Sequence, residues 1–187
     1  MRYVAVLLLG ACAEATTAQP AGNIDAPVTP IDSAKVIDAA PDAPASLCTS
    51  SATCAAAMDI GSVSGDTGAA MVTGSGYQSA WYRVRVTEDD SSVLGTALRV
   101  TVRLTSPASA NYDLYVYVNT GSDVVECSAV SGSSTQTGTQ DSVSLSWGEG
   151  SVANGADDSR SVSIEVRPVS GACAMSQPYQ LVVLGDS

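Results

Sequence analysis

Period-two alternation of apolar and polar residues, repeated in short runs from residue 47 onward, constrains the fold of this chain more than any other feature. Successive side chains of a β-strand point to opposite faces, so each run predicts a strand with one buried face. Residues 58–63 and 123–129 are weaker strand candidates. The six clear runs are 81–86, 98–104, 112–118, 143–147, 162–166 and 179–183.

The spacing between these runs is too short for crossover helices, and no useful apolar stripe with a helical period is present. Many short strands, each with one apolar face, can bury those faces by forming two sheets that pack against each other. We therefore predict an all-β fold, an antiparallel two-sheet β-sandwich, over residues 47–187. Because the chain has no Phe, its core must consist of Val, Leu, Ile and Ala with a few Tyr and Trp.

The first twelve residues combine one arginine, an apolar run and a cysteine that follows two small residues. This order predicts an export signal over residues 1–11. The sequence Leu9-Gly10-Ala11-Cys12 resembles the lipobox of bacterial lipoproteins, which implies that Cys12 is acylated and anchors the chain to a membrane. Ala13 is not the aspartate that holds many lipoproteins at the inner membrane, so the same analogy implies the outer membrane. The alternative is a secretory signal cut at another alanine.

Residues 12–46, which begin with the lipidated cysteine, are rich in Ala, Pro and Asp. Proline favours extended backbone, aspartates repel one another, and the few apolar residues cannot offset the entropy of ordering. We predict a disordered tether between the membrane and the domain. An alanine-proline-aspartate tether after a lipobox resembles lipoproteins of large-genome soil bacteria such as myxobacteria.

Charge and composition exclude several classes of function. The formal net charge is −11, from 8 basic and 19 acidic residues, whereas nucleic-acid binding requires a basic surface. The chain has no histidine, and its only lysine is Lys35 in the predicted tether. Histidine-dependent nucleophile systems and His-ligated zinc or iron sites are therefore excluded. Only carboxylates remain for acid-base work near neutral pH, so we predict no catalytic residues and no enzyme activity.

Four cysteines remain when Cys12 is set aside: Cys48, Cys54, Cys127 and Cys173. An even number in an exported chain indicates disulfides, for which three pairings are open. We predict Cys48–Cys54, because the two are close in sequence, and therefore Cys127–Cys173. A zinc site of four cysteines is the alternative, but neither spacing supplies the short knuckle that it requires.

Two acidic segments are candidates for calcium binding. Carboxylates on loops supply the oxygen ligands that Ca²⁺ prefers. The alternative is that both segments are solvated turns of an acidic protein, since neither matches an EF-hand loop. No other cofactor is expected. The six candidate ligands are Glu88, Asp89, Asp90, Glu149, Asp157 and Asp158.

A third candidate site combines arginine and aromatic residues on the polar faces of strands that we expect to be neighbours. Such residues are enriched at protein interfaces. The alternative is that they pair with Asp, Glu and Tyr across an exposed sheet face. The candidate partner-binding residues are Trp81, Arg83, Arg85, Arg99, Arg103, Tyr115 and Tyr117.

Asp66-Thr67-Gly68 matches the catalytic tripeptide of aspartic proteases. That chemistry requires two carboxylates that share a proton, and the sequence has no second copy of the motif. We predict an ordinary turn here.

As an ordered set, the strands resemble the bacterial pre-peptidase C-terminal (PPC) domain over residues 55–187. That family implies a jelly-roll-like accessory β-sandwich of secreted proteins, commonly appended to proteases, and some related collagen-binding domains bind calcium. The segment Asn111-Tyr112-Asp113-Leu114-Tyr115-Val116-Tyr117 is the most specific part of the resemblance. The others are 60–65, 81–84, 162–166 and 178–183.

These features together predict a monomeric, non-catalytic, lipid-tethered β-sandwich at the cell surface. It would act as a binding or accessory module for an envelope or extracellular partner, either a protein or a polysaccharide. A structural envelope protein without a specific ligand and a carboxylate-dependent hydrolase are the alternatives.

Overall fold

The structure is a computed structural model, and it describes residues 48–90, 95–149 and 155–186. The predicted signal, the candidate lipidation site Cys12 and the predicted tether lie outside these residues. Within the described part of the chain, no helix has the length and apolar character needed to cross a bilayer.

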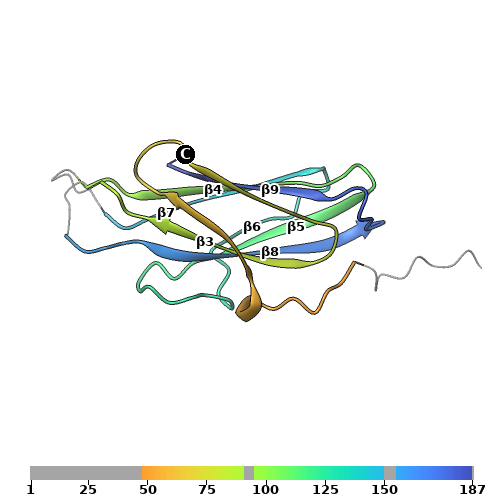
Figure 1. The fold of residues 1–187 in the computed structure, drawn as a ribbon, viewed down its shortest axis with the longest axis horizontal. Helices are drawn as coiled ribbons and strands as arrows, with labels where there is room; N and C mark the ends of the chain where they lie inside the picture. Colours follow the sequence, from red (N-terminus) through yellow and green to blue (C-terminus); the bar gives the residue numbers. More distant parts are fainter. Residues whose placement is uncertain (1–47, 91–94, 150–154, 187) are drawn as a thin grey trace, which may run out of the picture. The chain divides into compact units, whose positions relative to one another are not determined.

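The described residues form one short 3-10 helix and nine strands (Figure 1). The elements are η2 (Cys54–Ala56), β1 (Met58–Ser64), β2 (Met71–Gly76), β3 (Ala80–Thr87), β4 (Leu98–Thr105), β5 (Ala110–Tyr117), β6 (Gly132–Ser134), β7 (Gln140–Trp147), β8 (Arg160–Gly171) and β9 (Tyr179–Gly185).

The strands form two packed sheets, which confirms the predicted β-sandwich. Sheet A has the order β1-β3-β8-β5-β6 and sheet B the order β2-β9-β4-β7. Figure 1 shows them as two layers, with β4 and β9 in one and β3, β8 and β5 in the other. Neighbouring strands are antiparallel except for β1 and β3, which run parallel.

All six clear alternating runs are strands, and the weaker prediction at residues 58–63 is confirmed as β1. The strand predicted at 123–129 is wrong: these residues form bends and irregular backbone. Glu126 explains this, because its side chain accepts hydrogen bonds from the backbone N–H groups of residues 127–129. Those N–H groups are then not available to a strand partner.

Three tyrosines fill the space that phenylalanines would occupy in the core. The Tyr112 and Tyr179 rings pack edge to face with centroids 4.9 Å apart, and Tyr82 lies 6.5 Å from Tyr179. Their hydroxyls are satisfied, since Tyr82 and Tyr179 share a 2.9 Å hydrogen bond and Tyr112 donates to the Tyr77 carbonyl oxygen. Buried phenols need such partners.

Two glycines of β2 make room for these rings. A Cβ at Gly74 would lie 2.9 Å from the Tyr82 ring, and one at Gly76 would lie 2.5 Å from the Tyr179 hydroxyl. The segment therefore has few apolar side chains, which is why alternation in the sequence does not reveal β2.

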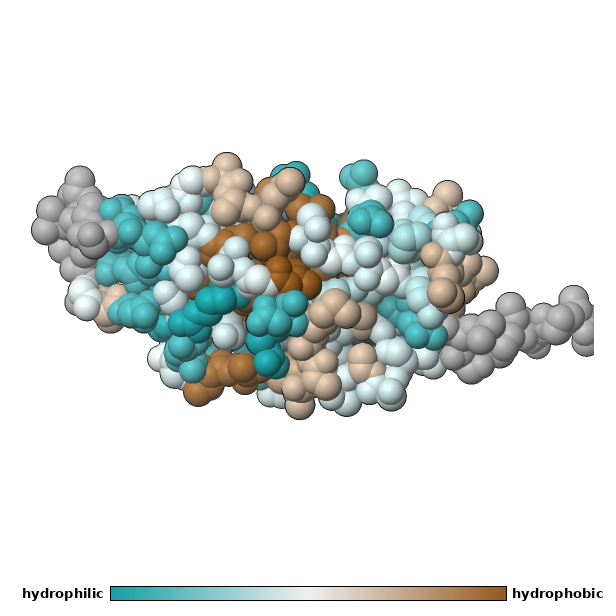
Figure 2. Space-filling model, viewed as in Figure 1, coloured by the Kyte–Doolittle hydropathy of each residue, from teal (hydrophilic) through white to brown (hydrophobic). Residues whose placement is uncertain are grey.

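β1 and β2 lie at the ends of their sheets and are in contact with each other. Met58 and Met71 are exposed there, by 60% and 64%. On the surface as a whole, Figure 2 shows hydrophobic residues gathered near the centre of one face of the molecule, among mostly polar ones.

The edge strand β1 is irregular, because its register against β3 shifts between Asp59 and Ser62. Such an irregularity makes an edge a poorer template for pairing with another chain.

Candidate functional site

The outer face of sheet A carries a row of large side chains. Alternation along β3, β8 and β5 turns the valines, isoleucine and leucine inward and leaves their neighbours outside. Strand register then sets Trp81 beside Glu165, and Glu165 beside Tyr115. Three strands that are distant in sequence therefore contribute to one surface.

The contacts within this row hold it in one arrangement. The Trp81 and Tyr117 rings lie 5.1 Å apart. Arg167 donates to the Glu165 carboxylate at 2.6 Å and to the Tyr117 hydroxyl at 3.1 Å, and its guanidinium lies 4.0 Å above the Tyr115 ring. We call these five residues the aromatic face: Trp81, Tyr115, Tyr117, Glu165 and Arg167.

Tyr117 is the most buried of the aromatic rings on this face and supports its neighbours. Its hydroxyl donates to Glu165 at 2.7 Å. Burial, with this hydrogen bond to an anion, raises the pKa of Tyr117 to about 12. Trp81 and Tyr115 are partly exposed, and the Arg167 side chain is 47% exposed, so these three can contact a partner.

The structure divides the predicted arginine set between the two sheets. Arg83 and Arg85 lie on the same outer face as Trp81, but Arg99 and Arg103 lie on β4 in sheet B. The prediction that β3 and β4 are neighbours is wrong, because the chain crosses to the other sheet between them and β3 pairs with β1 and β8. Sequence reasoning also missed Glu165 and Arg167 as site residues; their only signal was a polar position on a strand.

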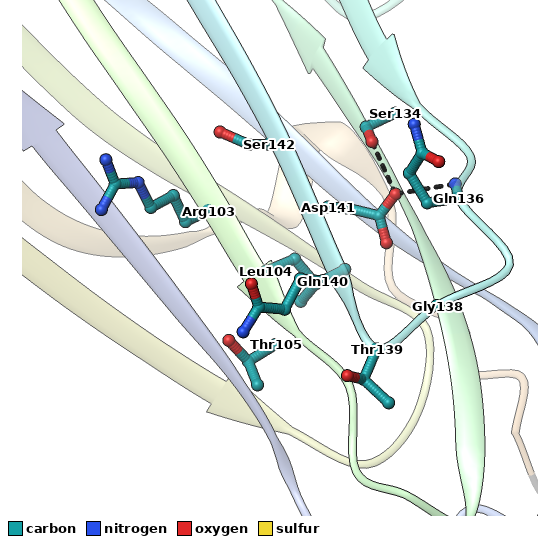
Figure 3. Close-up of a pocket in the computed structure, with 10 residues that line it drawn as sticks. All are labelled: Arg103, Leu104, Thr105, Ser134, Gln136, Gly138, Thr139, Gln140, Asp141 and Ser142. Carbon is teal, nitrogen blue, oxygen red and sulfur yellow. Dashed lines mark hydrogen bonds between the residues drawn. The ribbon is translucent and has the colours of Figure 1, made fainter.

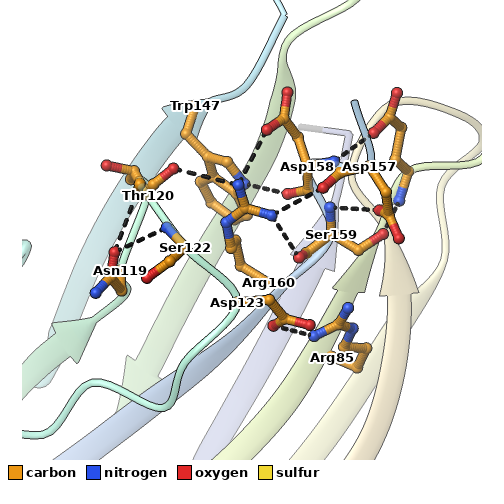
Figure 4. Close-up of polar contacts among 12 residues, drawn as sticks. Arg85, Asn119, Thr120, Ser122, Asp123, Trp147, Asp157, Asp158, Ser159 and Arg160 are labelled. Atoms are coloured by element: carbon orange, nitrogen blue, oxygen red, sulfur yellow. Dashed lines mark hydrogen bonds and ion pairs between the residues drawn. The ribbon is translucent and has the colours of Figure 1, made fainter. Parts of the chain in front are cut away.

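Arg83 and Arg85 bind segments that pack against the outer face of sheet A. Arg83 donates to the Cys54 carbonyl oxygen at 2.8 Å. Arg85 pairs with Asp123 in the β5–β6 connection, as Figure 4 shows. These two arginines therefore hold covering segments in place, while Trp81, Tyr115 and Arg167 stay at least partly exposed to solvent.

Both pairs of the predicted disulfide arrangement are wrong, although all four cysteines are bonded. The structure joins Cys48 to Cys173 and Cys54 to Cys127. The Cys48 carbonyl oxygen accepts from the N–H of Ser79, whereas Cys54 lies beside Arg83. Closeness in sequence did not decide the pairing, because the fold places Cys48 next to Cys173 and Cys54 next to Cys127, with Cα atoms 5.3 and 5.9 Å apart. Both separations lie within the range that a disulfide needs.

The two acidic segments that we singled out for calcium lie next to each other. The backbone N–H of Asp158 donates to the Glu88 carboxylate at 2.6 Å. The carboxylate of Asp66 accepts from the N–H groups of Asp89 and Asp90 at 3.0 and 2.8 Å. Asp66 thus lies in a turn, as predicted, where its carboxylate accepts a hydrogen bond from Ser64. The same carboxylate also anchors the loop that carries Asp89 and Asp90.

Several acidic side chains here already have protein partners. Asp158 pairs with the buried Arg160 at 3.0 Å, and the Trp147 indole N–H donates to the Asp158 carbonyl oxygen (Figure 4). Asp157 accepts from the N–H of Ser159. Among the residues that the structure describes, no group of three or more His, Cys, Asp or Glu side chains is arranged to hold a metal. Calcium binding stays a prediction.

A separate open pocket of about 800 Å³ lies where β6 and β7 approach each other (Figure 3). Asp141 is its most buried charged group, 2% exposed. No pattern in the sequence marked this residue, since it occupies an inward position of β7 where alternation predicts an apolar side chain. The pocket is lined by Arg103, Leu104, Thr105, Ser134, Gln136, Gly138, Thr139, Gln140, Asp141 and Ser142.

The chain matches no family model and no curated protein. Among solved structures it is similar to the pre-peptidase C-terminal domain of a collagenase from Bacillus anthracis, with 8% identity and a TM-score of 0.39 over 68% of this chain and 95% of that one. It is also similar to PliG, a periplasmic inhibitor of g-type lysozyme from Aeromonas hydrophila, with 16% identity and a TM-score of 0.27 over 67% of this chain and 96% of that one. The first is a domain of the family that the strand sequence resembles. Likenesses at these TM-scores carry no conclusion about function, and the fold rests on the strand pairing described above.

Proposed function

We propose that this protein is an exported, non-catalytic binding module that captures an envelope or extracellular partner, protein or polysaccharide, on the aromatic face. The observation that carries this proposal is the Arg167 guanidinium, which lies over Tyr115 while it is fixed by Glu165 and Tyr117. Aromatic rings and arginine dominate the energetics of interfaces. Groups already held in place lose little entropy when a partner binds.

The chemistry of the chain supports a binding role over a catalytic one. The sequence has no histidine and no lysine beyond Lys35. In the acidic loops, the carboxylates of Asp66 and Glu88 accept hydrogen bonds from backbone N–H groups, and Asp158 pairs with an arginine. Turnover in a panel of glycosidase and protease assays, lost on a single Asp→Asn change, would overturn the non-catalytic assignment.

The binding test uses the full chain and two substitutions on the aromatic face, Tyr115→Ser and Arg167→Ala. Both remove exposed contact groups and leave the core intact. We expect each to weaken capture of the partner from solubilised envelope, or of purified envelope polysaccharide, by roughly 5–30-fold, the effect of losing one hot-spot residue. Arg99→Ala is the matched control, because it removes an exposed arginine from the other sheet. Equal losses in all three variants would contradict the aromatic face, and no capture by the unmodified chain would favour the structural envelope role.

The proposed location is the cell envelope, through a lipid on Cys12 and a tether over residues 13–46. Two disulfides in one small domain are typical of exported proteins. Two or more acyl chains hold a protein stably on a membrane. We expect Cys12→Ala to abolish acylation and release the protein as a soluble monomer, measured by fractionation; the unmodified chain should fractionate with the outer membrane. Unchanged membrane retention of the variant would refute the anchor.

A further inference from the structure

We propose that the free edge of β7 pairs with an extended segment of a protein partner, and that this segment carries an acidic side chain facing Arg103. The segment would add a fifth strand to sheet B, beside β7. The aromatic face lies on sheet A, so this interface is a second position, and it specifies a polypeptide partner that the proposed function leaves open.

β7 is the longest regular edge strand among the described residues. It lies at the end of sheet B, and all eight of its residues pair with β4 in one register. The other three edges are shorter or already engaged: β6 has three residues, β1 has a register shift, and the Ser75 carbonyl oxygen at the edge of β2 accepts from the Tyr82 hydroxyl. Charged side chains, prolines and bulges usually protect an edge from pairing. None of these is present in residues 142–147.

The direction of the backbone groups of β7 follows from the ladder that joins it to β4. Just before the strand begins, the Ser106 N–H donates to the Thr139 carbonyl oxygen across the same register. In an antiparallel ladder, hydrogen-bonded pairs alternate with pairs whose N–H and C=O groups point away from each other. The backbone groups of Ser142, Ser144 and Ser146 therefore point to the free edge, where they have no hydrogen-bond partner among the described residues.

This edge is suited to a polypeptide rather than to a sugar. Its outward N–H and C=O groups recur about every 6.8 Å, because every second residue contributes and the rise per residue is ~3.4 Å. An extended peptide has complementary groups at the same interval and bonds to all of them at once. Leu145 adds an apolar contact, since its side chain packs against the core on the inner face but is only partly buried.

Arg103 determines which side chain the partner should carry. It lies in the same row as Ser142 of β7, and Figure 3 shows both side chains on the outer side of sheet B, with Asp141 on the opposite side. Arg103 is exposed, and the three ion pairs of the described residues use other arginines. An added strand would lie roughly 10 Å from β4, with only a serine between them in this row. An arginine and a glutamate that extend toward each other span that distance.

A second copy of this chain does not supply this acid. If two copies paired through β7, the side chains brought to the outer face would be Gln140 and the three serines, and none of these is a carboxylate. The acidic residue of β7, Asp141, points inward and accepts from the Ser134 hydroxyl. A partner of different sequence therefore fits the edge better than a copy.

The test is an NMR titration of the ¹⁵N-labelled full chain with two capped synthetic peptides, Thr-Val-Glu-Val-Thr-Val-Thr and the same sequence with Lys in place of Glu. Salt at about 150 mM screens the net charge of the chain beyond roughly 8 Å. We expect the Glu peptide to cause saturable shifts of the Ser142, Ser144 and Ser146 amide signals at millimolar concentration, and to slow hydrogen exchange of these amides. The Lys peptide should bind about threefold more weakly, the effect of one exposed ion pair.

Ser144→Pro tests whether the backbone of β7 makes the contact. Proline has no N–H, but the Ser144 N–H points to the free edge, so the bonds to β4 remain. We expect this variant to bind the Glu peptide at least about tenfold more weakly, since a backbone hydrogen bond is lost and the proline ring blocks close approach of the strand. Ser144→Ala is the matched control, because it also loses the hydroxyl bond to Thr101 at 2.8 Å but keeps the N–H. It should bind as the unmodified chain does.

Arg103→Glu keeps the test decisive if Ser144→Pro fails to fold, which a melting curve would show. This exposed substitution leaves the backbone unchanged and should reverse the preference, so that the Lys peptide binds about threefold more tightly than the Glu peptide. Arg167→Ala should bind both peptides as the unmodified chain does, so failure at this edge and failure at the aromatic face are distinguishable.

Four outcomes would overturn the proposal. They are the absence of shifts at the three serine amides, equal binding by folded Ser144→Pro and Ser144→Ala variants, an unchanged preference in Arg103→Glu, and dimerisation of the unmodified chain through these amides in the absence of peptide. The last result would assign the edge to a second copy of the chain.

Discussion

Single carboxylates organise the loops of this protein at the residue scale. Glu126 is the clearest case, because one of its oxygens accepts from the N–H groups of residues 127–129 and from the Ser128 hydroxyl. These hydrogen bonds lower the pKa of Glu126 from 4.5 to about 2. The ionised form therefore stabilises the loop that carries Cys127.

A pH titration tests this role of Glu126. Since its pKa is lower in the folded state, its contribution to stability is present above about pH 4.5 and is lost as the pH falls toward 2. We expect the amide signals of residues 127–129 to titrate together with a midpoint near 2 in NMR spectra of the folded protein. Glu126→Gln should abolish this titration. A midpoint near 4.5 in the unmodified protein would contradict the hydrogen-bonded arrangement.

Arg160 is a buried cation that holds the acidic segment 157–159 in place. Its guanidinium pairs with Asp158 and donates to the carbonyl oxygens of Asp157 and Ser159. Arg160→Met would leave the buried Asp158 carboxylate without this partner, and we expect a loss of about 3–5 kcal/mol in the free energy of unfolding. Urea denaturation measures it. Arg160→Met combined with Asp158→Asn should recover part of the loss, and a single variant as stable as the unmodified protein would show that the ion pair is dispensable.

The two disulfides attach otherwise peripheral elements to the sandwich at the scale of secondary structure. Cys54–Cys127 joins η2 to the β5–β6 connection, and Cys48–Cys173 joins the start of the described chain to the connection between β8 and β9. The pairs are 73 and 125 residues apart in sequence. On the chain-entropy model, loops of these lengths stabilise by about 4.4 and 4.9 kcal/mol.

Removal of Cys54–Cys127 should have both a local and a global effect. We expect Cys54→Ser with Cys127→Ser to speed hydrogen exchange across residues 118–131 and to lower the free energy of unfolding by up to about 4 kcal/mol. The matched control is Cys48→Ser with Cys173→Ser, which should destabilise the protein but leave exchange in that segment slow. Peptide mapping under non-reducing conditions that found Cys48 joined to Cys54 would contradict both expectations.

At the scale of the whole molecule, a disulfide attaches residue 48 to the folded domain. Cys48 is joined to Cys173 in the connection between β8 and β9, so residue 48 belongs to the domain. The Ala/Pro/Asp-rich composition of residues 13–46 predicts no fold of their own.

Limited proteolysis tests this boundary. We expect a nonspecific protease to remove residues 13–46 rapidly and to leave a stable fragment that begins near Leu47, because unfolded backbone is accessible and a closed sandwich is not. Reduction before digestion should make the fragment less resistant. Equal protection of residues 13–46 and of the domain would place the boundary elsewhere.

Local patterns in the sequence were sufficient to predict most of the strands and the faces they bury, but not β2 or β6. Whether Val84 points inward depends only on its neighbours along β3, because the period of two is a property of extended backbone. The same reasoning predicted that four cysteines are oxidised and that Trp81, Tyr115 and Tyr117 lie together. It failed for β2, where Gly74 and Gly76 make room for rings from other strands.

The tertiary structure alone decided which strands share a sheet, which cysteines pair and where the pocket lies. Arg99 and Arg103 do not lie on the predicted face with Arg83 and Arg85, because β4 pairs with β7 and β9 rather than with β3. Cys54 meets Cys127, and Asp141 meets Ser134, only after segments distant in the chain are brought side by side. Whether a segment forms a strand depends on its own residues and their nearest neighbours in the chain. These contacts depend instead on how the two sheets pack against each other. The sequence by itself therefore determined the strands that carry an alternating pattern and the faces they bury, and the packing of the sheets determined the sites.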